Sequence, residues 1–250
     1  MTPFSLFLIA ASPLIGSFLA TATVRLPAGE PLLLARSRCR TCARPLGPRD
    51  LLPLVSWLAR GGRCACRNVR LSLGYPAFEL AATAIGLAGV LLLDGPAMPV
   101  GVLLGWTLLL LAGLDLKAYW LPEWLTLPLI AAGLVFAAMD DRLPAALAGA
   151  MLGFAVPAGL AVLFRRWRGY DGMGLGDALL LAAAGAWLGW RSLPALVLIA
   201  CLLGLLLAVW QRRRRPEEPR IAFGACIAPV LWLAWLNEQS GGSMIDLAPA

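Results

Sequence analysis

Long apolar runs alternate with short polar stretches along the whole chain. Windows of about 20 mostly apolar residues give roughly eight candidate membrane spans. The candidate spans cover residues 4–24, 76–93, 97–114, 124–139, 144–164, 178–190, 193–210 and 221–237. The fourth and sixth spans are short, which is typical of membrane helices with a polar mouth at one end. The pattern therefore predicts an all-α integral membrane protein with about eight transmembrane helices.

Composition supports this class. Of the 250 residues, 60% are hydrophobic and 14% are charged, whereas soluble domains have about 25% charged residues. Residues 1–24 contain no Lys or Arg, so the basic beginning of a cleavable signal peptide is missing. We therefore expect the first apolar stretch to be a retained helix.

Positive charge is concentrated on one side of the predicted spans. All but two of the 21 basic residues lie in the loops after the first, third, fifth and seventh spans, and the exceptions are Arg142 and Arg191. The positive-inside rule places these loops in the cytoplasm and both termini outside. The net charge of +7 is thus a signal of topology and of attraction to anionic membrane lipid. It does not indicate nucleic-acid binding.

The pattern predicts four regions. Residues 1–24 form the first transmembrane helix, 25–75 a cysteine-bearing cytoplasmic insert, 76–240 a seven-helix membrane core, and 241–250 a flexible tail. The insert is too long for a plain connection between helices.

Four of the six cysteines lie in this insert: Cys39, Cys42, Cys64 and Cys66. Disulfides are disfavoured in the cytoplasm, so two close pairs predict a structural zinc site of four thiolates. The second pair is one residue shorter than the usual Cys-x-x-Cys spacing, and the chain has no histidine to replace a ligand. Reduced thiols or a redox site remain the alternatives.

Two aspartates lie at the cytoplasmic ends of predicted spans. Asp115 closes the third span, and Asp177 stands at the mouth of the sixth, after a glycine-rich turn. Aspartyl proteolysis needs one carboxylate as a base that activates water and a second, protonated one that polarises the scissile carbonyl. Without histidine, neither a Ser-His-Asp triad nor a Cys-His pair can form, which leaves carboxylate chemistry or a Ser-Lys type site.

Simpler roles exist for each aspartate. Asp177 would serve as an ordinary helix cap, and Asp115 as a counter-charge for Lys117. Asp171 and Glu123 are competing carboxylates. Only the pair at matched depth favours an aspartyl protease.

Taken in order, the motifs resemble those of the bacterial type IV prepilin peptidases, also called leader peptidase/N-methyltransferases. The matching residues are Gly16-Ser17-Phe18-Leu19, Arg25-Leu26-Pro27, Arg38-Cys39 with Cys42, Pro53 to Leu58, Gly62-Arg63-Cys64, Tyr75-Pro76 with Glu79, Asp115 with Leu121-Pro122, Leu125 to Pro128, Gly172 to Asp177, and Gly185 to Trp190. The resemblance covers nearly the whole chain, and the ordered combination is specific to this family.

The resemblance implies a bifunctional enzyme of the bacterial inner membrane. Such an enzyme cuts the basic leader from a prepilin or a secretion pseudopilin at the cytoplasmic face. It then methylates the new N-terminus with S-adenosylmethionine. Asp115 and Asp177 carry over as the catalytic pair. Glu79 and the cysteine insert are candidates for the methylation site, and Glu79 is alternatively a helix N-terminal charge.

The chain departs from the family pattern at several positions. Leu179 stands where a lysine is usual, and the second cysteine pair is shortened. The other departures are Ala20, Glu123 and the stretch from Ala222 to Ala225. A related protease that lacks methyltransferase activity, or that acts on a substrate other than a pilin, is therefore the alternative enzyme.

Two other classes of protein are alternatives to an enzyme. A transporter or ion pathway would carry a charge near the middle of the bilayer, and spans two to eight carry none well inside. A non-enzymatic assembly scaffold is kept open by Leu179. Neutralising either aspartate would abolish cleavage by a peptidase and leave the role of a scaffold intact.

Overall fold

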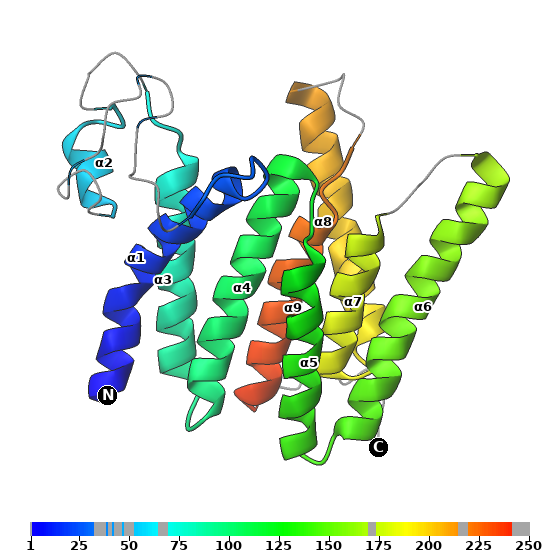
Figure 1. The fold of residues 1–250 in the computed structure, drawn as a ribbon. Coiled ribbons are helices and arrows are strands. Elements are labelled where there is room, and N and C mark those ends of the chain that lie inside the picture. The colour runs from blue at the N-terminus through cyan, green and yellow to red at the C-terminus, as the bar shows by residue number, and fades with distance from the viewer. Residues whose placement is uncertain are drawn as a thin grey trace. The chain divides into compact units, whose positions relative to one another are not determined.

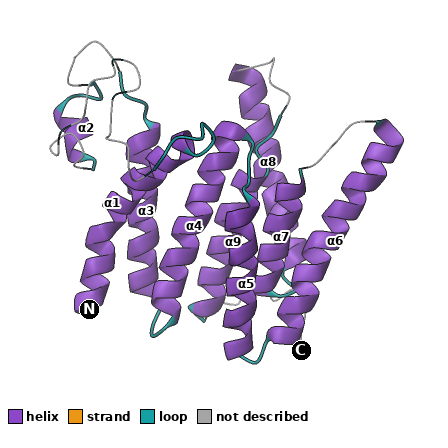
Figure 2. Cartoon of the chain, in the orientation of Figure 1, coloured by secondary structure: helices purple, strands orange, loops and turns teal. Residues whose placement is uncertain are grey.

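The computed structural model describes residues 2–32, 39, 42, 47, 53–64, 70–169, 174–214 and 220–241 (Figure 1). Within those residues every regular element is a helix, apart from one isolated antiparallel bridge between Arg63 and Arg70 (Figure 2). The helices are α1 (Pro3–Arg25), α2 (Val55–Ala59), α3 (Gly74–Leu92), α4 (Ala97–Ala118), α5 (Glu123–Met139), α6 (Leu143–Arg168), α7 (Leu175–Leu188), α8 (Leu193–Arg214) and α9 (Gly224–Gln239). The predicted all-α class is confirmed.

Each predicted span coincides with one of the long helices, α1 and α3 to α9. Four of them, α1, α3, α4 and α6, are long and apolar enough to cross a membrane. The apolar helices α5 and α7 have only 17 and 14 residues, as expected for the short fourth and sixth spans. The chain is therefore a multi-pass membrane protein, and the count of eight spans stays a prediction.

The chain divides into two compact units, Met1–Lys117 and Ala118–Ala250. In the first unit, α1 packs closely on α3. A Cβ atom at Gly16 would lie 2.6 Å from the Cα atom of Glu79, so only glycine allows this approach. The α4 helix joins α3 through Trp106, whose indole nitrogen donates to the Ala82 carbonyl at 3.2 Å.

In the second unit, α7 is the central helix and packs on α5, α6 and α9. Its residues from Leu180 to Leu188 are all buried, and most of them are small. Small residues let helix backbones approach, which is how membrane helices gain packing contacts. Gly153 on α6 shows the closeness, because a Cβ there would lie 2.8 Å from the Leu181 carbonyl carbon.

Two helix boundaries shift the predicted site residues slightly. The α4 helix continues to Ala118, so Asp115 lies inside its last turn instead of ending it. Lys117 favours this extension, because a cation interacts well with the C-terminal end of a helix. The α7 helix begins at Leu175, so Asp177 lies inside the first turn.

Some predictions fall outside the described residues. These concern Cys66, Asp171 and the tail from residue 242 onward. The four-region division of the chain also remains a prediction.

Candidate functional site

Asp115 is buried, with 5% of its surface exposed, in the last turn of α4. Two residues earlier, Gly113 lies against α1 and α3. A Cβ at Gly113 would be 2.6 Å from Thr23 Cγ2 and would also meet the ring of Phe78. The absence of a side chain at Gly113 therefore lets α1 and α3 approach the turn that carries Asp115.

Lys117 lies in the same turn, two residues after Asp115, and it also contacts α1 and α3. Its ammonium donates a hydrogen bond of 2.6 Å to Thr23 Oγ1 and lies 5.4 Å from the centroid of the Phe78 ring. Thr23 is fully buried, and its hydroxyl in turn donates to the Ala20 carbonyl at 2.8 Å. One hydroxyl thus joins the ends of α1 and α4.

Asp177 is half-buried in the first turn of α7, three residues after the N-cap residue Gly174. Its amide donates to the Gly174 carbonyl at 3.2 Å. A Cβ at Gly174 would be 3.7 Å from Asp177 Oδ2, so the carboxylate lies near the helix start. A negative charge is favourable there, but the N-cap position belongs to Gly174, so Asp177 is not the helix cap.

The start of α7 contacts the segment that follows α4. A Cβ at Gly176 would be 2.8 Å from the Cβ of Leu121. Nearby in sequence, the Tyr119 hydroxyl donates to the Arg220 carbonyl at 3.4 Å, and Tyr119 has a positive φ of 50°. The region around Tyr119 and Leu121 is therefore tied to the start of α7 and to the segment before α9.

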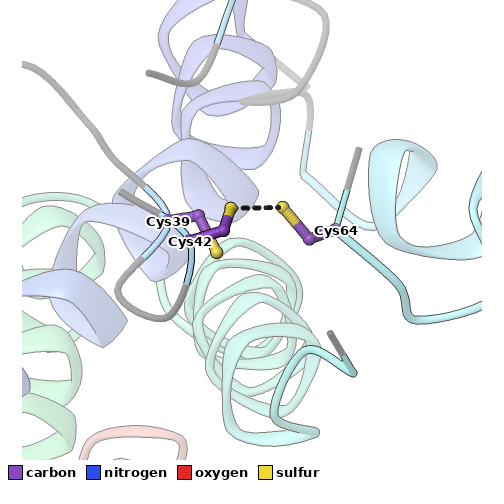
Figure 3. Close-up of side chains that lie close together, drawn as sticks. All are labelled: Cys39, Cys42 and Cys64. Atoms are coloured by element: carbon purple, nitrogen blue, oxygen red, sulfur yellow. Dashed lines mark hydrogen bonds between the residues drawn. The ribbon is translucent and has the colours of Figure 1, made fainter. Parts of the chain in front are cut away.

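Three of the four predicted metal ligands lie together (Figure 3). The Sγ atoms of Cys39, Cys42 and Cys64 all lie within 4.8 Å of one another, and those of Cys42 and Cys64 are 3.8 Å apart. A tetrahedral site with zinc–sulfur bonds of about 2.3 Å has sulfur–sulfur edges of about 3.8 Å. A disulfide would need about 2.05 Å. The arrangement therefore fits a metal ion better than a disulfide.

Glu79 connects the cysteine insert to the membrane helices. Its carboxylate is buried and accepts a hydrogen bond of 2.7 Å from the Leu54 amide, just before α2. Leu54 has a positive φ of 57°, a strained conformation for a residue of its size. Glu79 lies beyond the first turn of α3, so the alternative of a helix N-terminal charge is wrong.

The predicted residues thus fall into separate groups. Asp115 belongs to the first unit and Asp177 to the second, and three cysteines share one cluster in the first unit. The sequence reasoning missed Thr23 and Phe78, which contact the turn that carries Asp115 through Gly113 and Lys117. Thr23 had one visible signal, a polar side chain near the end of an apolar run.

Comparison with known proteins covers most of the chain. Residues 102–209 match the type IV leader peptidase family, and residues 10–93 match the bacterial peptidase A24 N-terminal domain. Asp115 and Asp177 both fall in the first of these ranges. No solved structure matches the chain.

Several curated proteins are similar over most of their length, and those cited here are named prepilin leader peptidase/N-methyltransferase. The protein of Aeromonas salmonicida strain A449 is 36% identical over 214 residues, which cover 84% of this chain and 74% of that protein. The protein of Burkholderia pseudomallei strain K96243 is 41% identical over 212 residues, covering 81% and 67%. That of Dickeya chrysanthemi is 40% identical over 215 residues, covering 81% and 75%. With this identity over this length, the chain belongs to the type IV leader peptidase family.

Proposed function

We propose that this chain is a membrane aspartyl endopeptidase that removes the basic leader from type IV prepilins or type II secretion pseudopilins. It then methylates the new N-terminus. The observation that carries the proposal is the family match, together with the shared name of the relatives, prepilin leader peptidase/N-methyltransferase. Cleavage takes place at the cytoplasmic face of the bacterial inner membrane, where the basic loops lie by the positive-inside rule.

Asp115 and Asp177 form the catalytic pair in this proposal. One carboxylate takes a proton from water, and the other, protonated, donates a hydrogen bond to the scissile carbonyl. As the water oxygen attacks, the carbonyl becomes a tetrahedral intermediate. As the C–N bond breaks, the leaving amine takes the proton that the first carboxylate removed from water, and the second carboxyl keeps its proton.

The length of α7 allows a site near the membrane surface. With 14 residues, α7 is about 21 Å long, and the hydrocarbon core of a bilayer is about 30 Å thick. A helix this short does not cross the core, so when its first turn, with Asp177, lies at or just below the headgroups, its other end stops about 9 Å short of the opposite surface. A pilin's apolar helix in the bilayer would present its leader junction at that depth.

Chain connectivity allows the pairing of the two carboxylates. Leu121 follows Asp115 by six positions and contacts Gly176, the residue before Asp177. Six residues span at most about 20 Å when fully extended. This limits only the length of chain between Asp115 and the contact at Gly176, and the pairing itself is tested by substitution.

The cysteine cluster is proposed to hold a structural zinc ion through Cys39, Cys42 and Cys64, with Cys66 as the fourth ligand. Four thiolates leave no open position for substrate, so the zinc would stabilise the insert and take no part in the chemistry. S-adenosylmethionine supplies the methyl group. The carboxylate of Glu79 is engaged by the Leu54 amide, so we assign no residue to that cofactor.

The proposal is tested by co-expressing a model prepilin with the wild type, Asp115→Asn or Asp177→Asn and measuring the intact mass of the pilin. We expect loss of the leader with the wild type only, and an added methyl group on the cleaved pilin. Asp94→Asn is the matched control, because Asp94 is exposed in the turn between α3 and α4. Equal processing by all four proteins would refute the aspartyl mechanism, and none by the wild type would refute the substrate class.

A further inference from the structure

We propose that Thr23 and Lys117 are positioning residues for Asp115. In this view the Thr23 hydroxyl and the Phe78 ring hold the Lys117 ammonium and so fix the rotation of the last turn of α4. The inference rests on the proposed catalytic role of Asp115. It assigns a role to the side-chain contacts that join α1, α3 and α4 within the first unit.

The contact joins a buried hydroxyl to the end of a lysine side chain that belongs to an exposed residue. Thr23 is 0% exposed, and its hydroxyl accepts from Lys117 at 2.6 Å while donating to the Ala20 carbonyl at 2.8 Å. The donated bond fixes the direction of the hydroxyl proton, which leaves a lone pair for the ammonium. A hydrogen bond from a charged donor is about twice as strong as a neutral one.

The Phe78 ring is the second contact of the Lys117 ammonium. It comes from α3, and Lys117 Nζ lies 5.4 Å from its centroid, within the range of a cation–π interaction. Lys117 is therefore held from two helices at once. A long flexible side chain loses rotamer freedom when it is held in this way, and a hydroxyl and a ring together offset that cost better than either alone.

Helical geometry relates these contacts to Asp115. Gly113 and Lys117 are four residues apart, so they share one face of α4. Asp115 is two residues from each and therefore lies on the opposite side of the same turn. The face with Gly113 and Lys117 is seated against Thr23 and Phe78. Fixing that face fixes the direction in which Asp115 leaves the helix.

The last turn of a helix needs stabilising contacts from outside the helix. Its last four carbonyl groups have no partner within the helix, and a negative charge is unfavourable at this end. The turn that carries Asp115 is therefore weak by itself. A displacement of about 1 Å at a catalytic group can cost about a hundredfold in rate.

The test compares Thr23→Val with Thr23→Ser in purified, folded enzyme, measuring kcat and KM for cleavage of one prepilin. Valine keeps the shape of threonine and removes the hydroxyl, whereas serine keeps the hydroxyl. We expect Thr23→Val to lower kcat about ten- to a hundredfold with KM within about twofold. Thr23→Ser should stay within about threefold of the wild type, because the hydrogen bond remains.

Lys117→Met tests the same contact from the other helix and serves if Thr23→Val fails to fold. It should lower kcat as Thr23→Val does, and the double variant should lose no more than either single one. Equal losses in Thr23→Ser and Thr23→Val, a change in KM alone, or additive losses in the double variant would overturn the proposal. Wild-type enzyme that leaves the prepilin uncut would instead refute the proposed function.

Discussion

The two units of the molecule support an aspartate in different ways. In the first unit, side chains from α1 and α3 reach the turn of Asp115 through Thr23 and Phe78. In the second unit, the helix of Asp177 is held by backbones that approach closely at glycines of α6 and α7. The first arrangement depends on a few side-chain contacts, and the second depends on the close packing of helix backbones. They should therefore fail under different substitutions.

The aspartates also lie at opposite ends of their helices. Asp115 is in the last turn of α4 and Asp177 in the first turn of α7. The helix dipole favours a negative charge at the start of a helix and disfavours it at the end, by about 0.3–1 kcal/mol at exposed sites. Two carboxylates with unequal preference for charge suit a pair in which one is base and the other acid.

The largest expected effect concerns the cysteine cluster. A metal ion should stabilise the insert that carries this cluster, whereas close helix packing stabilises the second unit. Cys64→Ser should remove bound zinc, because Cys64 is buried beside Cys39 and Cys42 and a structural site fails without its full thiolate set. Zinc content of the purified protein measures this. Cys201→Ser, at an exposed position in α8, is the control. Zinc-free wild type would contradict the metal site.

Backbone packing in the second unit is tested by Gly149→Ala. A Cβ at Gly149 would lie 2.8 Å from the Gly189 carbonyl carbon, and backbone cannot move aside as a side chain can. We expect the free energy of unfolding to fall by about 1–3 kcal/mol, measured by thermal melting in detergent. Gly159→Ala in the same helix meets nothing within 4 Å and should be neutral or slightly stabilising. Equal shifts would show that close packing is not the cause.

The matching substitution in the first unit is Gly113→Ala. Its new Cβ would meet the end of the Phe78 ring and the Thr23 methyl group, which are side-chain atoms that can shift. The loss of unfolding free energy should be smaller than for Gly149→Ala, at about 1 kcal/mol. Melting both variants side by side measures the difference. A larger loss in Gly113→Ala would reverse the comparison between the units.

The smallest effect is expected at the far end of the second unit. Arg142 pairs with Glu238 and, at 3.4 Å, with Asp140, and all three side chains are about a third or more exposed. Arg142→Gln should therefore cost about 0.2–1 kcal/mol, and added salt should shrink the difference. Thermal melting at low and high salt checks this. A loss as large as that of Gly149→Ala would mean that charge, more than shape, holds this unit.

Long apolar runs were enough to predict every described helix except the short α2. Every predicted span coincides with a helix, and the short fourth and sixth spans are the short α5 and α7. The proximity of Cys39, Cys42 and Cys64 was also predictable, because close cysteine pairs in a cytoplasmic segment have few other uses. These features depend on residues near one another in sequence or on one distinctive chemistry.

Contacts between distant residues could not be predicted in this way. The Thr23 hydroxyl and the Lys117 ammonium are 94 positions apart, and Leu54 and Glu79 are 25 apart. The sequence around each of these residues does not indicate which distant residue it contacts. The resemblance to a family marked Asp115 and Asp177, but it carried no information about Thr23, which lies outside the motifs quoted for it.

The measurement that most directly tests the catalytic pair is the residual cleavage rate of Asp115→Asn, Asp177→Asn and the double variant. Purified proteins would be compared with one prepilin under the same conditions. Residues that act as a unit are strongly non-additive, so each single variant should lose as much activity as the double. If the two single losses instead multiply in the double variant, or if either single variant keeps substantial activity, the aspartates do not act as a pair.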